Sequence, residues 1–233
     1  MGRPIPALRS AMKNLFQKGG LILLMLLGLA VLLYPTVSRR INGFHSSTAV
    51  QDLSQQLQNT DQAELERQLA LAEGYNEALR EQLEFSVEYD GILNFGNGIM
   101  GILRIPAIGV ELPIYHGMES DVLAKGVGHM PGSAFPIGGS GEHSVLTGHT
   151  GLPSAKLFTD LSKLGIGDVF VVSVAGRELT YRVDQILTVL PTENDPLMPV
   201  PGMDYCTLVT CTPYGINSHR LLVRGCREEE GAS

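Results

Sequence analysis

The chain has 233 residues, 44% of them hydrophobic and 18% charged, which suits one well-packed domain with appendages and excludes a disordered or collagen-like protein. Its net charge of −7 excludes a general nucleic-acid binder, and 27 glycines with 13 prolines favour a turn-rich β protein. The charge is unevenly spread: the first 40 residues hold six basic residues and no acidic one, whereas the other 11 basic residues stand against all 24 acidic ones, a net charge of −13.

An uncharged segment follows a basic leader, residues 1–18. Residues 19–37 read GGLILLMLLGLAVLLYPTV, which just reaches the length of about 17 to 25 residues that a membrane-spanning helix needs. A cleavable signal peptide is the alternative, but its apolar core is shorter and no clear small-x-small cleavage site follows. We therefore expect an uncleaved single-pass anchor in the cell membrane. More basic residues precede it than follow it, which favours a cytoplasmic leader and an extracellular body.

Residues 38–85 have a helical period and are expected to form a stalk that raises the body from the membrane or covers its side. The apolar residues recur at helical spacing with one break: Val50, Leu53 and Leu57, then Leu65, Leu69, Ala72, Leu79 and Leu83. Capping boxes that begin at Thr48 and at Asp61 predict two helices that meet near Asn59.

Residues 99–227 change to short β-rich runs separated by Gly/Pro clusters, after a linker of residues 86–98 and before a polar tail of residues 228–233. Seven or eight strands in about 130 residues predict an all-β sandwich or closed barrel with short helices. The runs are Ile99–Pro106, Val110–Tyr115, Ser144–Thr147, Val169–Val174, Leu179–Leu190, Tyr205–Thr210 and Arg220–Arg224.

Three predicted strands carry reactive side chains at their ends. His149 follows one strand, Cys211 ends another before a Pro/Gly turn, and Arg220 opens the strand after that turn. A thiol nucleophile needs a histidine to set its ionisation and a donor for the developing oxyanion, so these three residues could meet at one catalytic site. Alone, a cysteine that ends an apolar strand is more often a buried small hydrophobe, and a histidine between glycines is more often a surface residue.

The other cysteines and histidines show no spacing of metal ligands, so we expect no metal and no cofactor. Cys206 and Cys226 are interpreted as buried, unreactive thiols. Cys206 and Cys211 lie five apart in one strand, hence on opposite faces, which disfavours a disulfide between them. Four of the remaining histidines are interpreted as structural or surface residues: His45, His116, His129 and His143. His219, on the turn beside Arg220, could orient that arginine.

Residues 143–161, HSVLTGHTGLPSAKLFTDL, and 207–225, TLVTCTPYGINSHRLLVRG, resemble the signature segments of sortases, in particular of the pilus-building class C. The resemblance extends to residues 97–117, NGIMGILRIPAIGVELPIYHG, and to residues 63–76 of the stalk, AELERQLALAEGYN. It therefore covers most of the chain beyond the anchor. Thr150 stands where these sortases more usually have an arginine.

The resemblance implies an eight-stranded β-barrel and a cysteine transpeptidase without a cofactor. It makes Cys211 the nucleophile, His149 the general acid and base, and Arg220 the residue that stabilises the oxyanion. Cys211 would attack the Thr–Gly bond of an LPxTG-like sorting signal, and an amine would resolve the thioester. The implied partners are LPxTG-bearing pilins or surface proteins, an amine acceptor such as a pilin lysine, and the membrane, with no nucleic acid.

Three other functions stay open at this point. A housekeeping sortase would join surface proteins to peptidoglycan peptide amines, and a hydrolytic cysteine protease would resolve the thioester with water. A non-catalytic sorting-signal receptor or pilus-base scaffold would bind the signal without cutting it.

Two features depart from the pattern of pilus sortases. Those enzymes usually carry a lid with an Asp-Pro-aromatic tripeptide before the barrel, and residues 86–98 contain no Asp-Pro. We expect an absent or vestigial lid and a groove that is accessible at rest. Many members also have a C-terminal membrane span, whereas residues 228–233 are polar. Either the N-terminal helix alone anchors the protein, or the chain continues beyond this sequence.

Overall fold

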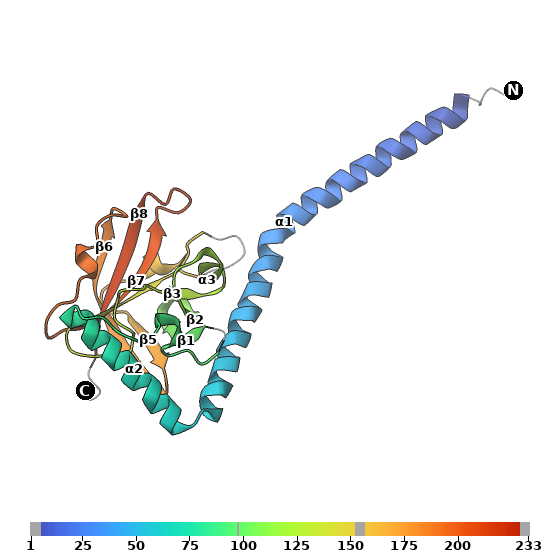
Figure 1. Cartoon of the computed structure of the whole chain (residues 1–233). Coiled ribbons are helices and arrows are strands. Elements are labelled where there is room, and N and C mark those ends of the chain that lie inside the picture. Colours follow the sequence, from blue (N-terminus) through green and yellow to red (C-terminus); the bar gives the residue numbers. More distant parts are fainter. Residues whose placement is uncertain (1–5, 97, 152–156, 229–233) are drawn as a thin grey trace.

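A computed structural model describes the backbone of residues 6–96, 98–151 and 157–228, and their side chains except those of residues 6–17 and 39–45. Helix α1 (Pro6–Asn59) contains one segment, Lys18–Ser38, that is long and apolar enough to cross a membrane, with a mean hydropathy of 2.4. Its large apolar side chains are exposed. Pro35 lies inside α1, and the helix is bent (Figure 1), because a proline removes a backbone hydrogen bond and kinks the helix. This segment fits a single-pass membrane anchor.

The stalk forms two helices, but the first of them does not begin at Thr48. Thr48 lies inside α1, which runs unbroken from the apolar segment to Asn59, so the predicted helix start there is wrong. Residues 38–47 contain one glycine and no proline, and nothing in them ends the helix. The second helix, α2 (Gln62–Glu81), begins as predicted at Asp61, whose side chain accepts a hydrogen bond from the backbone N–H of Ala63.

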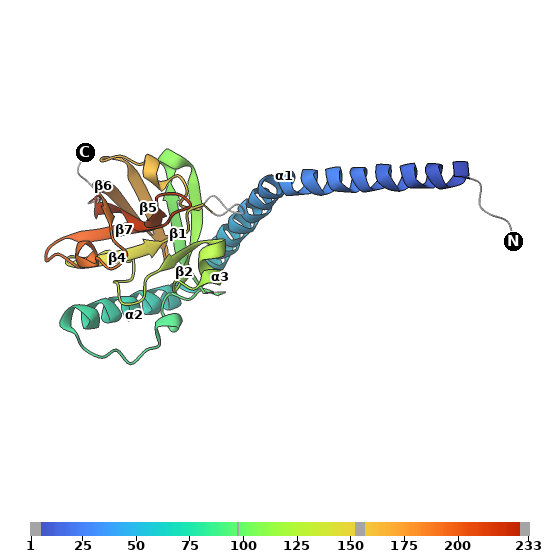
Figure 2. The same cartoon turned by 90° about the horizontal axis from the view of Figure 1, so that it is seen from above.

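Both stalk helices pack against the body. Val50 and Leu53 of α1 are buried in the main core, as are Leu69 and Ala72 of α2. In Figures 1 and 2, α2 lies along one side of the body, while the N-terminal part of α1 projects away from it.

Hydrogen bonds from the buried side of α2 fix its position. Asn76 Nδ2 donates to Phe135 O at 3.1 Å and to Glu142 Oε2 at 2.8 Å, and Asn76 Oδ1 accepts from Phe135 N at 2.7 Å. Gln68 Oε1 accepts from Leu93 N at 2.6 Å. Both amides are buried, so these bonds replace the water that the side chains lose. The helical stalk covers the side of the body, one of the two roles predicted for it.

Residues 99–227 form a closed barrel of eight strands in the order β1-β2-β3-β4-β7-β8-β6-β5, which confirms the predicted all-β barrel. The pairs β2–β3 and β4–β7 are parallel and the others are antiparallel. The strands are β1 Ile99–Ile105, β2 Val110–His116, β3 Val127–His129, β4 Glu142–Thr147, β5 Val169–Val174, β6 Arg177–Val189, β7 Asp204–Thr212 and β8 His219–Arg227. Short helices join them: α3 Ser120–Lys125, η2 Pro106–Ile108, η3 Leu161–Lys163 and η4 Asp195–Leu197.

Successive side chains of β7 and β8 point alternately to the interior of the barrel and to its outer face. Cys206 and Leu208 of β7 and Val223 of β8 belong to the main core. Their neighbours Val209 and Leu222 belong to a second apolar cluster with Val145 of β4, on the opposite face of the sheet. This outer cluster also includes Met130, Leu187, Val189 and Leu197.

The segment that leads into β1 contacts α2 at its start and β3 further along. The ring of Phe85 lies edge-on to Tyr75 of α2, with centroids 6.0 Å apart. Tyr89, in the short helix η1 (Tyr89–Gly91), places its hydroxyl 2.8 Å from His129 Nδ1 of β3. The described residues of the linker therefore contact the stalk and β3, and they also contact β2, where His116 lies within hydrogen-bond distance of Ile92 O and Gly98 O.

A first prediction concerns Glu142, where α2 meets the barrel. Burial raises the pKa of Glu142 from 4.5 to about 7; Asn76 and Arg80 oppose the rise, and Asp204 and Glu73 add to it. The folded state therefore binds this proton more tightly than the unfolded state does. Its contribution to the free energy of unfolding is present below the unfolded pKa and is lost as the pH rises through about 7.

Glu142→Gln keeps an acceptor for Asn76 and removes the titration. The midpoint of thermal unfolding should fall less in this variant than in the wild type between about pH 5 and about pH 8. Glu77→Gln, a change at an exposed acidic residue of α2 that does not act on Glu142, is the matched control and should follow the wild type. Identical pH profiles for Glu142→Gln and the wild type would contradict the raised pKa.

Candidate active site

Cys211 and Arg220 lie opposite each other at one end of the barrel. They are Cα partners in the antiparallel register of β7 and β8. Partners in such a pair project to the same face of the sheet. The face is the outer one, because Val209 and Leu222, two positions away on the same strands, belong to the outer cluster. Cys211 is a partly exposed free thiol.

His149 joins this pair from the neighbouring strand. β4 runs parallel to β7 with Thr147 beside Val209, and the ladder continues for one more bond, from Gly148 N to Val209 O at 3.0 Å. Thr210 Oγ1 also donates to Gly148 O at 2.7 Å. Extending this register by two residues beyond Thr147 and Val209 brings His149 beside Cys211. Since neighbouring strands lie about 4.8 Å apart, the register predicts that His149, which follows β4, forms with Cys211 and Arg220 a row roughly 10 Å long.

Backbone carbonyls at the turn between β7 and β8 hold the guanidinium group of Arg220. Arg220 Nη1 donates to the carbonyl oxygens of Asn217, at 3.2 Å, and His219, at 3.1 Å. Among the described residues its Nε and Nη2 have no partner, so these donors are available to a bound group. The sequence could not reveal these two acceptors, because every residue has a backbone carbonyl and its side chain does not show which carbonyl accepts a hydrogen bond.

The same turn meets the loop that carries His149. Gly151 has a φ of +76°, and a Cβ there would lie 3.0 Å from Cε2 of Tyr214. Both conditions favour glycine. The loop after β4 and the turn after β7 are therefore in close contact, which limits how far His149 can move from Cys211.

The two other thiols have different surroundings. Cys206 is fully buried inside the barrel, and burial raises its pKa well above the usual value. Cys226 is partly exposed rather than buried, and burial also raises its pKa. A raised pKa reduces the thiolate that attacks carbonyl groups. Both thiols are free, as predicted.

Three of the other histidines are structural. His116, His129 and His143 are buried and hydrogen-bonded; His143 Nε2, for example, lies 2.7 Å from Thr207 Oγ1. The side chain of His45 lies outside the described residues. In the part of the chain that the structure describes, no group of three His, Cys, Asp or Glu side chains is arranged to hold a metal ion.

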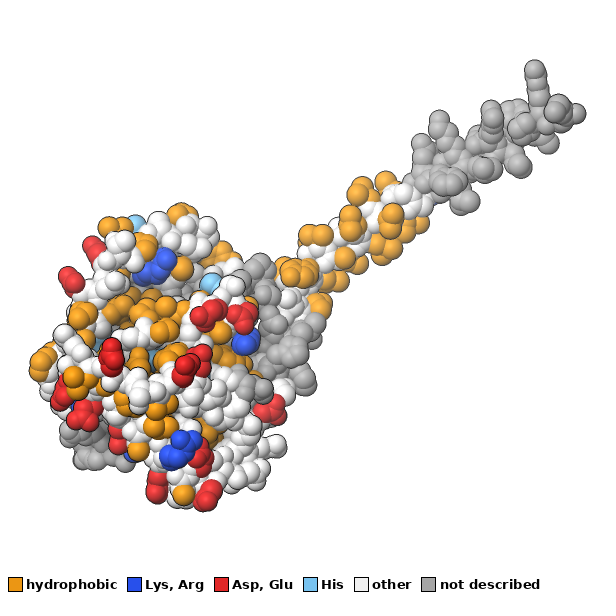
Figure 3. Space-filling view, viewed as in Figure 1, with side chains coloured by type: hydrophobic (Ala, Val, Ile, Leu, Met, Phe, Trp, Pro, Cys, Tyr) orange, Lys and Arg blue, Asp and Glu red, His pale blue; other side chains and the backbone are white. Residues whose placement is uncertain are grey.

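A cleft of about 480 Å³ opens on the same outer face as Cys211. Its base includes His143 and Val145 of β4, and its sides include Met130 and Met198 from two connections between strands. Hydrophobic side chains gather across this side of the barrel (Figure 3). The sequence did not reveal the cleft because its lining comes from segments far apart in the chain.

The sortase domain model matches residues 103–228, more than half of the chain. The chain belongs to the sortase family. The matched region contains the row formed by His149, Cys211 and Arg220.

Solved sortases of class C resemble this sortase closely. It is 42% identical to sortase C1 from Streptococcus agalactiae, with a TM-score of 0.74 over 78% of this chain and 99% of that one. It is 41% identical to sortase C from Streptococcus pneumoniae, with a TM-score of 0.73 over 80% of this chain and 99% of that one. Sortase SrtE1 from Streptomyces coelicolor is 34% identical over 55% of this chain and 40% of its own length. The chain spans about half the length of the curated relatives it matches.

A second prediction concerns Thr147, two residues before His149. Its hydroxyl is buried and has no hydrogen-bond partner among the described residues of this sortase, whereas the hydroxyls of Thr207 and Thr210 both have one. A buried hydroxyl without a partner costs about 1 to 3 kcal/mol.

Thr147→Val keeps the branched shape and removes this cost, so the free energy of unfolding should rise by about 1 kcal/mol. Chemical denaturation measures the change. Thr210→Val is the matched control and should lower the free energy of unfolding, because it removes the bond to Gly148 O. A loss of stability in both variants would show that the Thr147 hydroxyl has a partner.

Proposed function

We propose that this sortase is a membrane-anchored transpeptidase that cleaves an LPxTG-like sorting signal through a thioester on Cys211 and transfers the acyl group to an amine. The observation that carries the proposal is the row of His149, Cys211 and Arg220 across three strands, beside an apolar cleft on the same face. A thiol, a proton carrier and a cationic donor are the groups that acyl transfer requires.

In the first half-reaction, the Cys211 thiolate attacks the carbonyl carbon of the threonine in the Thr–Gly bond. The unpaired N–H groups of Arg220 donate to the oxyanion that forms. The C–N bond then breaks, His149 gives a proton to the leaving glycine amine, and a thioester remains on Cys211. In the second half-reaction an amine attacks the thioester, His149 takes up its proton, and Cys211 departs as a thiolate.

The acceptor that we propose is a lysine of a pilin subunit. The support is the class of the structural neighbours, which are sortases C, one of them described together with its pilin substrate specificity. Attachment to a peptidoglycan amine is the alternative for this second half-reaction. The apolar helix of α1 supports a single-pass position in the cell membrane, with the barrel on the extracellular side as the charge asymmetry favours.

We further propose that the site is open at rest. The residues that stand where pilus sortases carry a lid contact α2 and β3 through Phe85 and Tyr89, away from the end of β7 that bears Cys211. A donor peptide should therefore acylate Cys211 without activation or removal of any segment.

The decisive measurement is the intact mass of the full chain in detergent micelles after mixing with an LPxTG peptide, with and without an amine acceptor. We expect an acyl adduct that the amine removes faster than water does. An adduct cleared equally fast by water would show a hydrolase, and a bound but uncut peptide would show a receptor. A pilin lysine peptide and a peptidoglycan peptide, compared as acceptors, distinguish pilus assembly from cell-wall attachment.

A third prediction tests the nucleophile. Cys211→Ala should abolish the adduct and all turnover, because no other thiol lies in the row with His149 and Arg220. Cys206→Ala and Cys226→Ala are the matched controls and should retain the adduct. Comparable losses in all three variants would contradict a single nucleophile at Cys211.

A fourth prediction tests the oxyanion donor. Arg220→Ala should lower kcat about 10²- to 10³-fold, since one lost donor to a developing oxyanion has an effect of this size. Arg224→Ala is the control on the same face of β8, where Arg224 instead pairs with Asp184 at 2.7 Å. A wild-type kcat in Arg220→Ala would assign oxyanion stabilisation to another group.

A further inference from the structure

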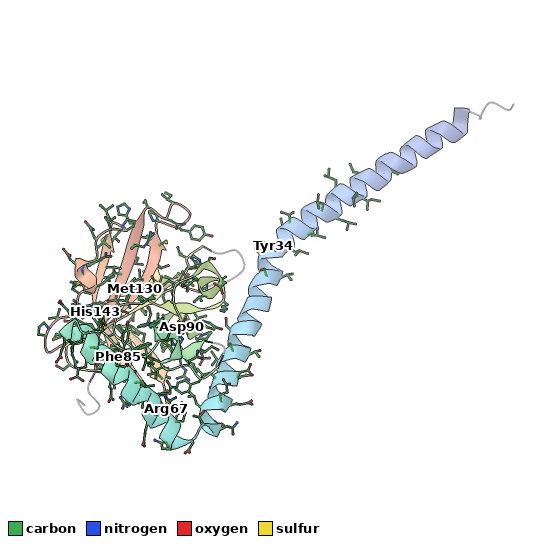
Figure 4. The ribbon with its side chains drawn as sticks, viewed as in Figure 1. Tyr34, Arg67, Phe85, Asp90, Met130 and His143 are labelled. Carbon is green, nitrogen blue, oxygen red and sulfur yellow. The ribbon has the colours of Figure 1, made fainter. Side chains whose placement is uncertain are left out.

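The cleft beside the active site has one side formed by the stalk. Leu79, Arg80 and Gln82, at the C-terminal end of α2, line the same cavity as His143 and Val145 of the barrel. Figure 4 shows Met130 and His143, two other lining residues, between α2 and the upper ends of β7 and β8. A helix outside the barrel therefore lines a cleft on the same outer face as Cys211.

The register of β4 and β7 gives the distance between this cleft and Cys211. Val145 pairs with Thr207, four residues before Cys211, and Glu142 pairs with Asp204, seven residues before it. At about 3.3 Å per residue, the cleft extends from roughly 13 to roughly 23 Å from Cys211. The end formed by α2 is the distant one, because Asn76 and Arg80 bond to Glu142.

The length of an extended donor peptide can be compared with the distance between Cys211 and the cleft. An extended polypeptide spans at most about 3.3 to 3.6 Å per residue. The four residues on the acyl side of the scissile bond in an LPxTG-like signal therefore end near Val145. The fifth and sixth residues before the bond, which precede the sorting motif, reach about 17 to 22 Å and so lie in the part of the cleft toward α2.

The acyl side is the part of the donor that this surface would hold. It stays attached to Cys211 between the two half-reactions, whereas the glycine side leaves. The buried outer cluster of Val145, Val209 and Leu222 lies between the catalytic row and the cleft, and Val145 belongs both to this cluster and to the lining of the cleft. In the other direction β7 ends at Thr212 in an exposed turn, which leaves that side to the incoming amine.

The side chains that line the α2 end of the cleft determine which kind of donor side chain would bind to it. Leu79 is 38% exposed and Met198 is 61% exposed, and both face the cavity with Met130 and Leu197. Three of the polar groups at that end, Asn76, Arg80 and Glu142, are engaged with one another or with backbone carbonyls. Large exposed apolar side chains that meet at a cavity mark a site for apolar partners.

We propose that the C-terminal end of α2 forms a subsite for an apolar side chain five or six residues before the scissile bond of the donor polypeptide, and that Leu79 is its main contact. This inference rests on the proposed function. It assigns to the stalk helix a part in the choice of donor, in addition to its packing against the barrel.

Two donor peptides test the subsite. Both contain the same sorting motif, preceded in one by two leucines and in the other by two serines, and the full chain in detergent micelles transfers each to the same amine. The ratio of the two kcat/KM values is the readout. We expect the wild type to favour the leucine peptide about tenfold, since burial of one leucine side chain is worth at least about 1.5 kcal/mol.

Leu79→Glu should reduce this ratio to about one, and Leu79→Ser should reduce it in the same direction without adding a charge. Leu83→Glu is the matched control: Leu83 is also exposed, lies four residues further along, and is not part of the cleft, so its ratio should equal that of the wild type. Thermal unfolding of each variant shows that it is folded.

The outcomes separate the two proposals. Equal kcat/KM values for both peptides in the wild type, or a wild-type ratio in Leu79→Glu and Leu79→Ser, would overturn the α2 subsite and leave the transpeptidase intact. Failure of the wild type to transfer either peptide would overturn the transpeptidase and the subsite with it.

Discussion

The pairing of β7 with β4 on one side and β8 on the other is the constraint on which the site depends. β4 and β8 are distant in sequence; β8 contributes Arg220 to the row around Cys211, and the segment directly after β4 contributes His149. Backbone hydrogen bonds fix the register of all three strands, and closure of the barrel leaves none of them at an edge. The site therefore does not require a long-range side-chain contact to hold it together. It requires only that β7 keeps its register with β4 and with β8.

The stalk is held to the barrel by a different kind of interaction. Gln68 and Asn76 are buried amides whose hydrogen bonds go to the backbone of Leu93 and Phe135 and to Glu142. Breaking any of these bonds without readmitting water would leave a buried polar group unpaired. Because polar bonds are directional, they fix the orientation of α2, which apolar packing alone does less strictly. This orientation is what places Leu79 at the cleft.

The sequence predicted most of the barrel, because alternation of apolar residues is a local property. Seven of the eight strands lie where this pattern placed them, whereas β3 was missed: it has three residues, one of them Gly128, and too little length to show a period. The helix start expected at Thr48 was wrong because a capping box is only a local preference, and α1 already runs through it. His149, Cys211 and Arg220 could be named from their motifs, but their register could not, since it depends on strand pairing. The cleft and the hydrogen bonds of Asn76 join segments too distant for any local pattern to reveal.

The choice of nucleophile among the thiols follows from the same alternation that builds the core. Cys206 and Cys211 are five residues apart on β7, so one side chain enters the barrel and the other points to the outer face. Inside, burial raises the pKa of Cys206 and no carbonyl group of a substrate can reach it. On the outer face, Cys211 pairs with Arg220 of β8, and the register of β4 predicts His149 on its other side. A shift of one residue in the register of β7 would exchange these positions, placing Cys211 in the core and Cys206 at the surface. The packing that excludes water from Leu208 and Val223 therefore also keeps Cys211 on the face where acyl transfer can occur.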